Sequence, residues 1–250
     1  MSKWKDPFYV GYLPLPAAFR PFVNAFIAAG IVGLIVFATV LGAKQEDRGP
    51  GQWNTSQTFA IEGHLIAEPY PILYVSDSGS DVGVRAVLLV SSLKFGANER
   101  AAAFSGKYVR AEGHFIALGG RAMFELVDGE RALSLIDAGT PAPRVESLGQ
   151  FTLTGEIMDS KCFLGVMKPG YGKTHRSCAV RCISGGIPPI FVTRDEAGAA
   201  TIYLLTDADH RAVNQAVLPY VADSVELSGT LERHGDLLVY SIDPRRIARR

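Results

Sequence analysis

An uninterrupted apolar run near the N-terminus is the first feature of the hydropathy pattern. Residues 22–43 carry no charged side chain. At about 1.5 Å per helical residue this run reaches roughly 33 Å, enough to cross the hydrocarbon core of a bilayer. It is longer than the apolar core of a typical secretory signal peptide, and it begins after a 21-residue lead. The pattern therefore predicts a single transmembrane helix over residues 22–44.

The residues that flank this run bear on its orientation. The lead, residues 1–21, places aromatic side chains among prolines, a composition that suits the membrane interface. Only Lys and Arg count in the positive-inside rule, and they are Lys3, Lys5 and Arg20 before the run against Lys44 and Arg48 after it. This difference favours a cytoplasmic N-terminus and a C-terminal body outside the cytoplasm.

The rest of the chain alternates between apolar and polar positions with the period of a β-strand. It begins with a linker at 45–58 that is rich in Gly, Pro and Ser and is expected to be irregular. A motif of apolar–polar–Gly–variable–apolar residues then recurs around Gly63, Gly113, Gly155 and Gly229. We interpret each copy as a strand that bends or bulges at its glycine. Short helices are expected at 97–103 and 207–218.

The four copies divide the body into two similar halves. One copy opens and one closes each half, which predicts β domains at 59–140 and 150–247 with a linker over 138–144. Each half ends in a hairpin signal, and about five short strands with one small helix suit a Greek-key barrel of the OB type. A small β-sandwich is the alternative. We therefore predict a mainly β protein, with two OB-like barrels in tandem after one transmembrane helix.

The two halves differ in length at one place. Gly63 and Gly113 are 50 residues apart, whereas Gly155 and Gly229 are 74 apart, so the second half carries about 24 extra residues. Residues 161–186 are the obvious place for them, and this segment contains all three cysteines of the chain. An insertion on a repeated scaffold that gathers every cysteine is where we expect the function to lie.

The insertion has the residue types of a metal site. His175 and Cys178 are three residues apart and Cys178 and Cys182 are four apart, so all three can face one side of a helix. With Cys162 they form a Cys3His set that suits tetrahedral zinc, and also iron or copper; an iron–sulfur centre stays open. Met167 is a further candidate ligand. Asp159 is a candidate for orienting a ligand through a hydrogen bond, or for capping a turn.

A disulfide is the main alternative for the same residues. In an oxidising compartment Cys162 can pair with Cys178 or Cys182, which leaves one thiol spare. Inert or redox-active thiols are the third option. The CxxxC spacing differs from the CxxC of thioredoxin-like proteins.

Composition and the lack of certain motifs argue against several other functions. The chain has 25 basic and 25 acidic residues, so it lacks the basic excess of a nucleic-acid binder. There is no CxxCH for covalent haem and no GxSxG, and the P-loop pattern fails because Met167 stands where its first glycine belongs. We expect a non-catalytic protein. His64 and His114 are better explained as strand-surface residues than as ligands, and the arginine-rich tail, 243–250, either contacts a partner or lipid or is frayed.

The second half resembles a known group of proteins. The stretch LTGEIMDSKC…HRSCAVRC…GGIPPIFV, followed by IYLL and VELSGTL, covers about 150–245 and is similar to bacterial membrane-anchored extracytoplasmic proteins of uncharacterised function. These share OB-like domains and a DxxC…HxxCxxxC segment. The resemblance implies a periplasmic body on the bacterial inner membrane and implies no activity. The layout of one anchor plus an exported OB barrel is also similar to cytochrome c-type haem chaperones, whose haem-attaching His this chain does not match.

Three functions follow as expectations. The first is a single-pass accessory subunit of a respiratory or electron-transfer complex, whose periplasmic body docks other membrane subunits and holds a metal. The second is a protein that delivers metal or haem. The third is a thiol–disulfide redox protein. The expected partners are the lipid bilayer and membrane protein subunits, and nucleic acid is not among them.

Overall fold

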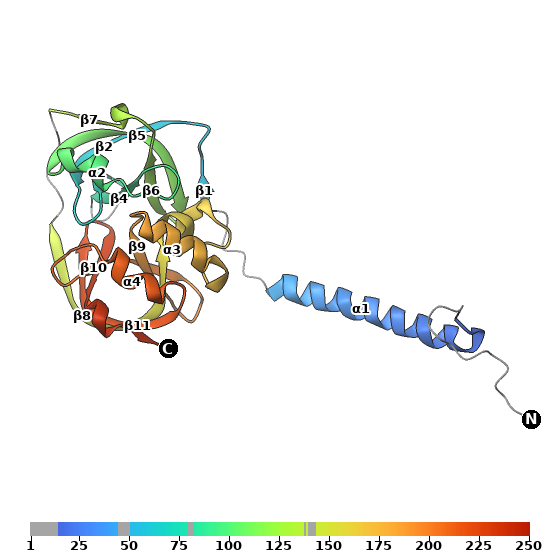
Figure 1. Ribbon diagram of the computed structural model, residues 1–250. Helices are drawn as coiled ribbons and strands as arrows, with labels where there is room; N and C mark the ends of the chain where they lie inside the picture. Colours follow the sequence, from blue (N-terminus) through green and yellow to red (C-terminus); the bar gives the residue numbers. More distant parts are fainter. Residues whose placement is uncertain (1–14, 45–50, 80–82, 138, 140–143) are drawn as a thin grey trace, which may run out of the picture. The chain divides into compact units, whose positions relative to one another are not determined.

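The computed structural model describes residues 15–44, 51–79, 83–137, 139 and 144–250 (Figure 1). The chain divides into two units, residues 1–49 and 50–250. Most of the lead, the first part of the linker at 45–58 and most of the linker at 138–144 lie outside the described residues.

The first unit contains one long apolar helix, α1 (Arg20–Lys44), which follows a 3₁₀ turn, η1 (Ala17–Phe19). No residue of α1 is buried, and its most apolar stretch has a mean hydropathy of 2.5. The hydroxyl of Thr39, a rare polar side chain in this helix, donates to the Val36 carbonyl one turn earlier. The helix is therefore long and apolar enough to cross a membrane, as the sequence predicts.

Five strands close into a barrel in the first half of the second unit. They are β2 (Phe59–Ile66), β3 (Ile72–Ser76), β4 (Val84–Val90), β5 (Lys107–Leu118) and β6 (Arg121–Leu126). Their order is β5-β2-β3-β4-β6, and pairing of β5 with β6 closes the ring. Only β4 and β6 pair in parallel.

Smaller elements surround this barrel. Two short strands, β1 (Gln52–Trp53) and β7 (Leu133–Leu135), pair with β5, and the turn η3 (Glu130–Ala132) precedes β7. The helix α2 (Asn98–Ala101) and the turn η2 (Ala102–Phe104) lie between β4 and β5, where the sequence predicts a helix. The linker at 45–58 is not irregular throughout, since β1 falls within it.

The second half repeats the same arrangement. Its strands are β8 (Val145–Asp159), β9 (Pro189–Arg194), β10 (Ala200–Asp207), β11 (Ser224–His234) and β12 (Leu237–Ile242). Their order is β12-β10-β9-β8-β11, β11 and β12 close the ring, and only β10 and β12 pair in parallel. Both rings are closed, so the alternative of a two-sheet sandwich does not describe them.

The remaining elements of this half refine two expectations. The predicted helix at 207–218 is shorter, namely α4 (Asn214–Val217) followed by the turn η6 (Leu218–Tyr220), because the Asp207 carboxylate accepts from nearby backbone N–H groups and holds a turn. The tail forms the turn η7 (Pro244–Arg246) and the strand β13 (Ala248–Arg249), which pairs with β11, so it is ordered rather than frayed.

The motif glycines are needed for close packing between strands. A Cβ on Gly113 or Gly229 would fall well inside van der Waals contact of a carbonyl oxygen on the next strand, and the same holds for Gly63 and Gly155. The one register shift along β11 lies at Leu231, two residues beyond its glycine. The glycines therefore mark close approach of neighbouring strands, and the expected bulge is not at the glycine.

Gly229→Ala is expected to destabilise the body by at least about 1–3 kcal/mol, because the new methyl group must push β12 away from β11. Gly79→Ala is the matched control, since its Cβ would lie 3.4 Å from the nearest atom, an ordinary contact. Urea unfolding of the full chain in detergent measures both. If both variants lose the same free energy of unfolding, close approach of the strands is not the reason for glycine at position 229.

The two barrels share a core. One cluster of buried residues fills the second barrel and continues into the first through Tyr70, Tyr74 and Met123. Hydrogen bonds also join the barrels: the Val213 N–H donates to the Tyr70 hydroxyl at 3.0 Å, and the Ala86 N–H donates to the Asp236 carboxylate at 2.7 Å. The halves therefore pack as one body, which allows a site to draw residues from both.

Tyr240 of β12 is fully buried, and its ring packs against those of Phe191 and Tyr203. Its hydroxyl donates toward the carbonyls of Phe151 and Leu227, 2.9 and 2.8 Å away, and burial raises its pKa to about 12. The folded state holds this proton more tightly than the unfolded chain, in which tyrosine titrates near pH 10. Its contribution to stability is therefore complete below about pH 10 and is lost as the pH rises through 12.

We expect Tyr240→Phe to lower the free energy of unfolding by about 1–3 kcal/mol at neutral pH, because the buried hydroxyl proton that the two carbonyls share is lost. The difference in free energy of unfolding between wild type and variant should narrow between pH 10 and 12. Unfolding curves across this range check the prediction, and a gap that stays constant would refute the assignment to Tyr240.

Candidate metal centre

The extra residues of the second half form a compact insertion between β8 and β9. Residues 160–188 make this connection, whereas only residues 67–71 connect β2 to β3 in the first barrel. The difference is the 24 residues expected from the spacing of the glycines. The insertion folds into a π-helical turn, η4 (Cys162–Val166), a 3₁₀ turn, η5 (Lys173–His175), and the helix α3 (Arg176–Ser184).

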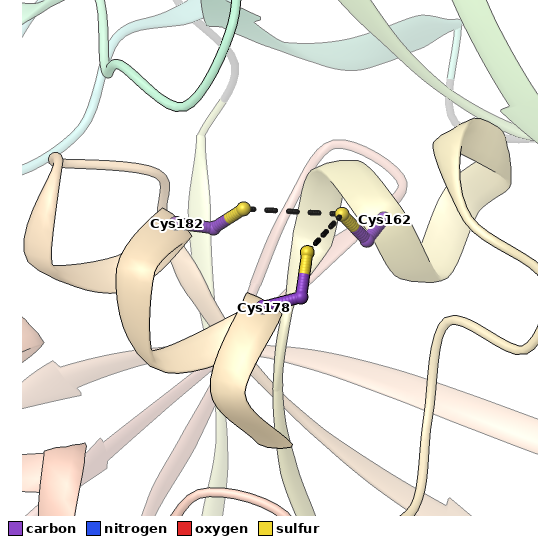
Figure 2. A group of neighbouring side chains, drawn as sticks. All are labelled: Cys162, Cys178 and Cys182. Atoms are coloured by element: carbon purple, nitrogen blue, oxygen red, sulfur yellow. Dashed lines mark hydrogen bonds between the residues drawn. The ribbon is translucent and has the colours of Figure 1, made fainter. Parts of the chain in front are cut away.

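The three cysteines of this insertion meet at one point. The Sγ atom of Cys162 lies 3.8 Å from that of Cys178 and 3.8 Å from that of Cys182 (Figure 2). All three sulfurs lie within 4.8 Å of one another. Cys162 comes from η4, directly after β8, while Cys178 and Cys182 project from successive turns of α3. Cys162 and Cys182 are buried, and Cys178 is partly exposed.

These distances suit a metal ion, and the sulfurs are not bonded to one another in this structure. A disulfide needs an S–S distance of about 2.0 Å, and all three cysteines are free thiols. An ion bound tetrahedrally at about 2.3 Å from each sulfur would hold the sulfurs roughly 3.8 Å apart. The cluster could therefore hold one ion such as zinc or copper(I), for which thiolates are preferred ligands.

A second group of ligand atoms overlaps the first and shares Cys162 with it. The Asp159 carboxylate, at the end of β8, accepts the Cys162 N–H at 2.8 Å and lies 2.9 Å from His175 Nε2. Both Asp159 and His175 are buried. Ligand atoms of Asp159, Cys162 and His175 lie within 4.8 Å of one another. The structure thus groups His175 with the carboxylate that fixes Cys162, rather than with all three sulfurs.

Met167 directly follows η4, and 44% of its surface is exposed. The two strand histidines lie outside both groups: His114 Nδ1 contacts the Gln57 carbonyl at 3.0 Å, and His64 is partly buried on β2. Among the described residues, the candidate ligands are therefore those of the insertion.

Lys94, from the first barrel, completes the centre and could not be found from the sequence. Its Nζ donates to Cys178 Sγ at 2.8 Å and to Cys182 Sγ at 3.5 Å. The loop that carries it is attached to the end of α3, because the Gly96 N–H donates to the Gly185 carbonyl at 2.9 Å. Lys94 is 84 residues from Cys178, so no local motif connects them.

The thiols and Lys94 influence each other's charge. The hydrogen bond to Cys178 raises the pKa of Lys94. The hydrogen bond from the Cys162 thiol lowers the pKa of Cys182, and the Lys94 charge adds to this effect. The pKa of Cys162 is raised, first by the same hydrogen bond and then by burial. The cluster therefore places negative charge beside Lys94, a cation that partly neutralises a set of thiolate ligands.

Lys161 holds the Lys94 loop in place. It is almost fully buried, and its Nζ lies 2.6 Å from the Glu125 carboxylate of β6. It also donates to the carbonyls of Ser91 and Leu93, at 2.9 and 2.7 Å. Since Lys94 follows Leu93 directly, these bonds fix the backbone from which Lys94 reaches the cysteines. Two residues of the DSKC sequence therefore position the site: Asp159 fixes Cys162, and Lys161 fixes the Lys94 loop of the other barrel.

Comparison with known proteins found no match among protein families, curated proteins or solved structures. The function is therefore argued from the site itself.

Proposed function

We propose that this chain is a membrane-anchored, non-catalytic accessory subunit of an electron-transfer complex, and that its β body holds one thiophilic metal ion through Cys162, Cys178 and Cys182. The observation that carries the metal site is the set of sulfur distances. Two Sγ pairs are separated by 3.8 Å, the separation expected around an ion with metal–sulfur bonds of about 2.3 Å.

The surroundings of the cysteines support the same proposal. Three thiolates around a divalent or monovalent ion leave the site with net negative charge, and the Lys94 ammonium lies 2.8 Å from one of the sulfurs. Asp159 holds the backbone of Cys162, as residues behind metal ligands commonly do. His175 contacts Asp159 through Nε2, and its ligand atom groups with Asp159 and Cys162 rather than with all three sulfurs. The three sulfurs and Lys94 are therefore the core of the proposed site.

The remaining parts of the proposal rest on the anchor and the repeated barrels. The apolar helix α1 is the proposed single membrane span, and the excess of Lys and Arg before it supports a cytoplasmic N-terminus with a periplasmic body. The shared strand order, with one parallel pair and a helix before the fourth strand, supports OB-like barrels in tandem. Barrels of this kind are docking modules, which suits a subunit that binds other membrane proteins.

Metal content tests the metal site. The full chain, purified in mild detergent without chelator, should carry about one equivalent of zinc or copper. Cys178→Ser should lose it, and Met167→Leu, the matched control at an exposed sulfur, should keep it. Wild-type protein without metal, and unable to take up zinc or copper(I) when reduced, would overturn the proposal.

Exposure of Cys178 favours a second function, metal delivery. Two sulfurs are buried, but Cys178 is partly exposed, so an incoming ligand can reach the ion on that side. A delivery protein should give up its metal to a competing chelator within minutes and take it back, whereas a closed structural site should resist. This exchange rate separates delivery from a permanent structural role.

A further inference from the structure

We propose that the metal-free cluster also carries out thiol–disulfide exchange with peptide disulfides, in which Cys178 is the attacking thiol and Cys162 the resolving thiol. This activity goes beyond metal binding, and it uses two of the three cysteines.

Cys178 has the surroundings of an attacking cysteine. It is partly exposed, whereas the other two cysteines are buried, so a substrate approaches the cluster at its sulfur. It lies in the first turn of the nine-residue helix α3, and Lys94 donates to its Sγ at 2.8 Å. The Lys94 ammonium is therefore positioned to stabilise the negative charge that this sulfur carries during exchange.

Cys162 has the surroundings of a resolving cysteine. It is buried, so a substrate does not reach it directly, but its Sγ lies 3.8 Å from that of Cys178. Asp159 fixes its backbone from behind. Its sulfur is therefore the neighbour that can attack Cys178 Sγ after the first step.

The Lys94 loop offers a surface for the substrate. Leu93 and Phe95 flank Lys94 and are 75% and 57% exposed. The buried Lys161 holds the carbonyls of Ser91 and Leu93, so the loop presents these side chains from a fixed backbone. An apolar surface beside a reactive thiol suits a disulfide carried on a peptide.

The reaction balances in two steps. The Cys178 thiolate attacks one sulfur of the substrate disulfide, which forms a mixed disulfide and releases the other substrate sulfur as a thiolate. The Cys162 thiol then attacks Cys178 Sγ, forms the Cys162–Cys178 disulfide, and releases the second substrate sulfur, which leaves with the Cys162 proton. The substrate disulfide is reduced to two thiols, and the protein dithiol is oxidised by two electrons.

Exchange with oxidised glutathione, a small peptide disulfide, tests the proposal on the full chain in detergent after reduction and removal of metal by chelator. Wild type should release two glutathione thiols per chain and form the Cys162–Cys178 bond, seen by peptide mass spectrometry. Its rate should exceed that of the urea-unfolded chain by at least about tenfold. In the variant Cys162→Ser the reaction should stop after the first step, with glutathione attached to Cys178.

Three further variants make the outcome specific. Cys178→Ser should lose the fast reaction. Lys94→Met should slow it by about tenfold, whereas Lys107→Met, at an exposed lysine away from the cluster, should not. Cys182→Ser should lose metal and keep the exchange, so failure of the metal site and failure of the exchange are told apart. A Cys162–Cys182 bond in wild type, no trapped adduct on Cys178, or a rate equal to that of the unfolded chain would overturn the proposal.

Discussion

Replacing Lys161 with methionine is expected to lower the free energy of unfolding of the body by about 3–5 kcal/mol. The side chain is 2% exposed and pairs with Glu125 at 2.6 Å, so its loss leaves a buried carboxylate without a partner. The carbonyls of Ser91 and Leu93 lose their donor as well. Urea unfolding of the full chain in detergent gives the difference.

Two comparisons make this result specific. The double variant Lys161→Met/Glu125→Leu should recover part of the loss, because no unpaired charge remains buried. Lys107→Met should change stability by less than about 0.5 kcal/mol, since that lysine is exposed. If the single and double variants are equally destabilised, the unpaired Glu125 charge is not the cause.

Asp159→Ala is expected to weaken metal binding by about 10- to 100-fold and to destabilise the body. The buried carboxylate accepts the Cys162 N–H and pairs with His175, and alanine removes both contacts. Cys162 is then no longer fixed in the position from which its sulfur meets the other two. Competition with a chromophoric chelator measures the affinity.

Asp159→Asn provides the graded control for this position. Its amide oxygen can still accept the Cys162 N–H, and its amide group can still bond to His175 if the imidazole changes tautomer. We expect its affinity to lie between those of wild type and Asp159→Ala. An alanine variant that binds metal as tightly as wild type would show that Asp159 does not position Cys162.

The repeated fold could be predicted because the signal was local and occurred four times. Glycine is required wherever a carbonyl of the next strand approaches closely, so Gly63, Gly113, Gly155 and Gly229 recur at matching places in both barrels. Their unequal spacing also gave the length of the insertion. The sequence left a bend or a bulge open at these glycines, and the one register shift along β11 lies at Leu231 instead, because glycine serves close approach of strands as well as bulges.

The centre could be predicted only in part, because some of its residues come from a distant segment. The gathering of three cysteines followed from the short insertion and from the four-residue step between Cys178 and Cys182. Lys94 belongs to the other barrel, and its role depends on how the barrels pack. Lys161 and Asp159 are adjacent to the motif, but their partners Glu125 and His175 are set by the tertiary structure.

The most direct test of the metal site is X-ray absorption at the metal edge, on full-length protein reduced and loaded with zinc or copper(I) in detergent. The account predicts a first shell with three sulfur atoms at about 2.3 Å, and no such shell in Cys182→Ser, which loses the ion. A shell of nitrogen and oxygen alone, or the same sulfur count in the wild type and the variant, would contradict it.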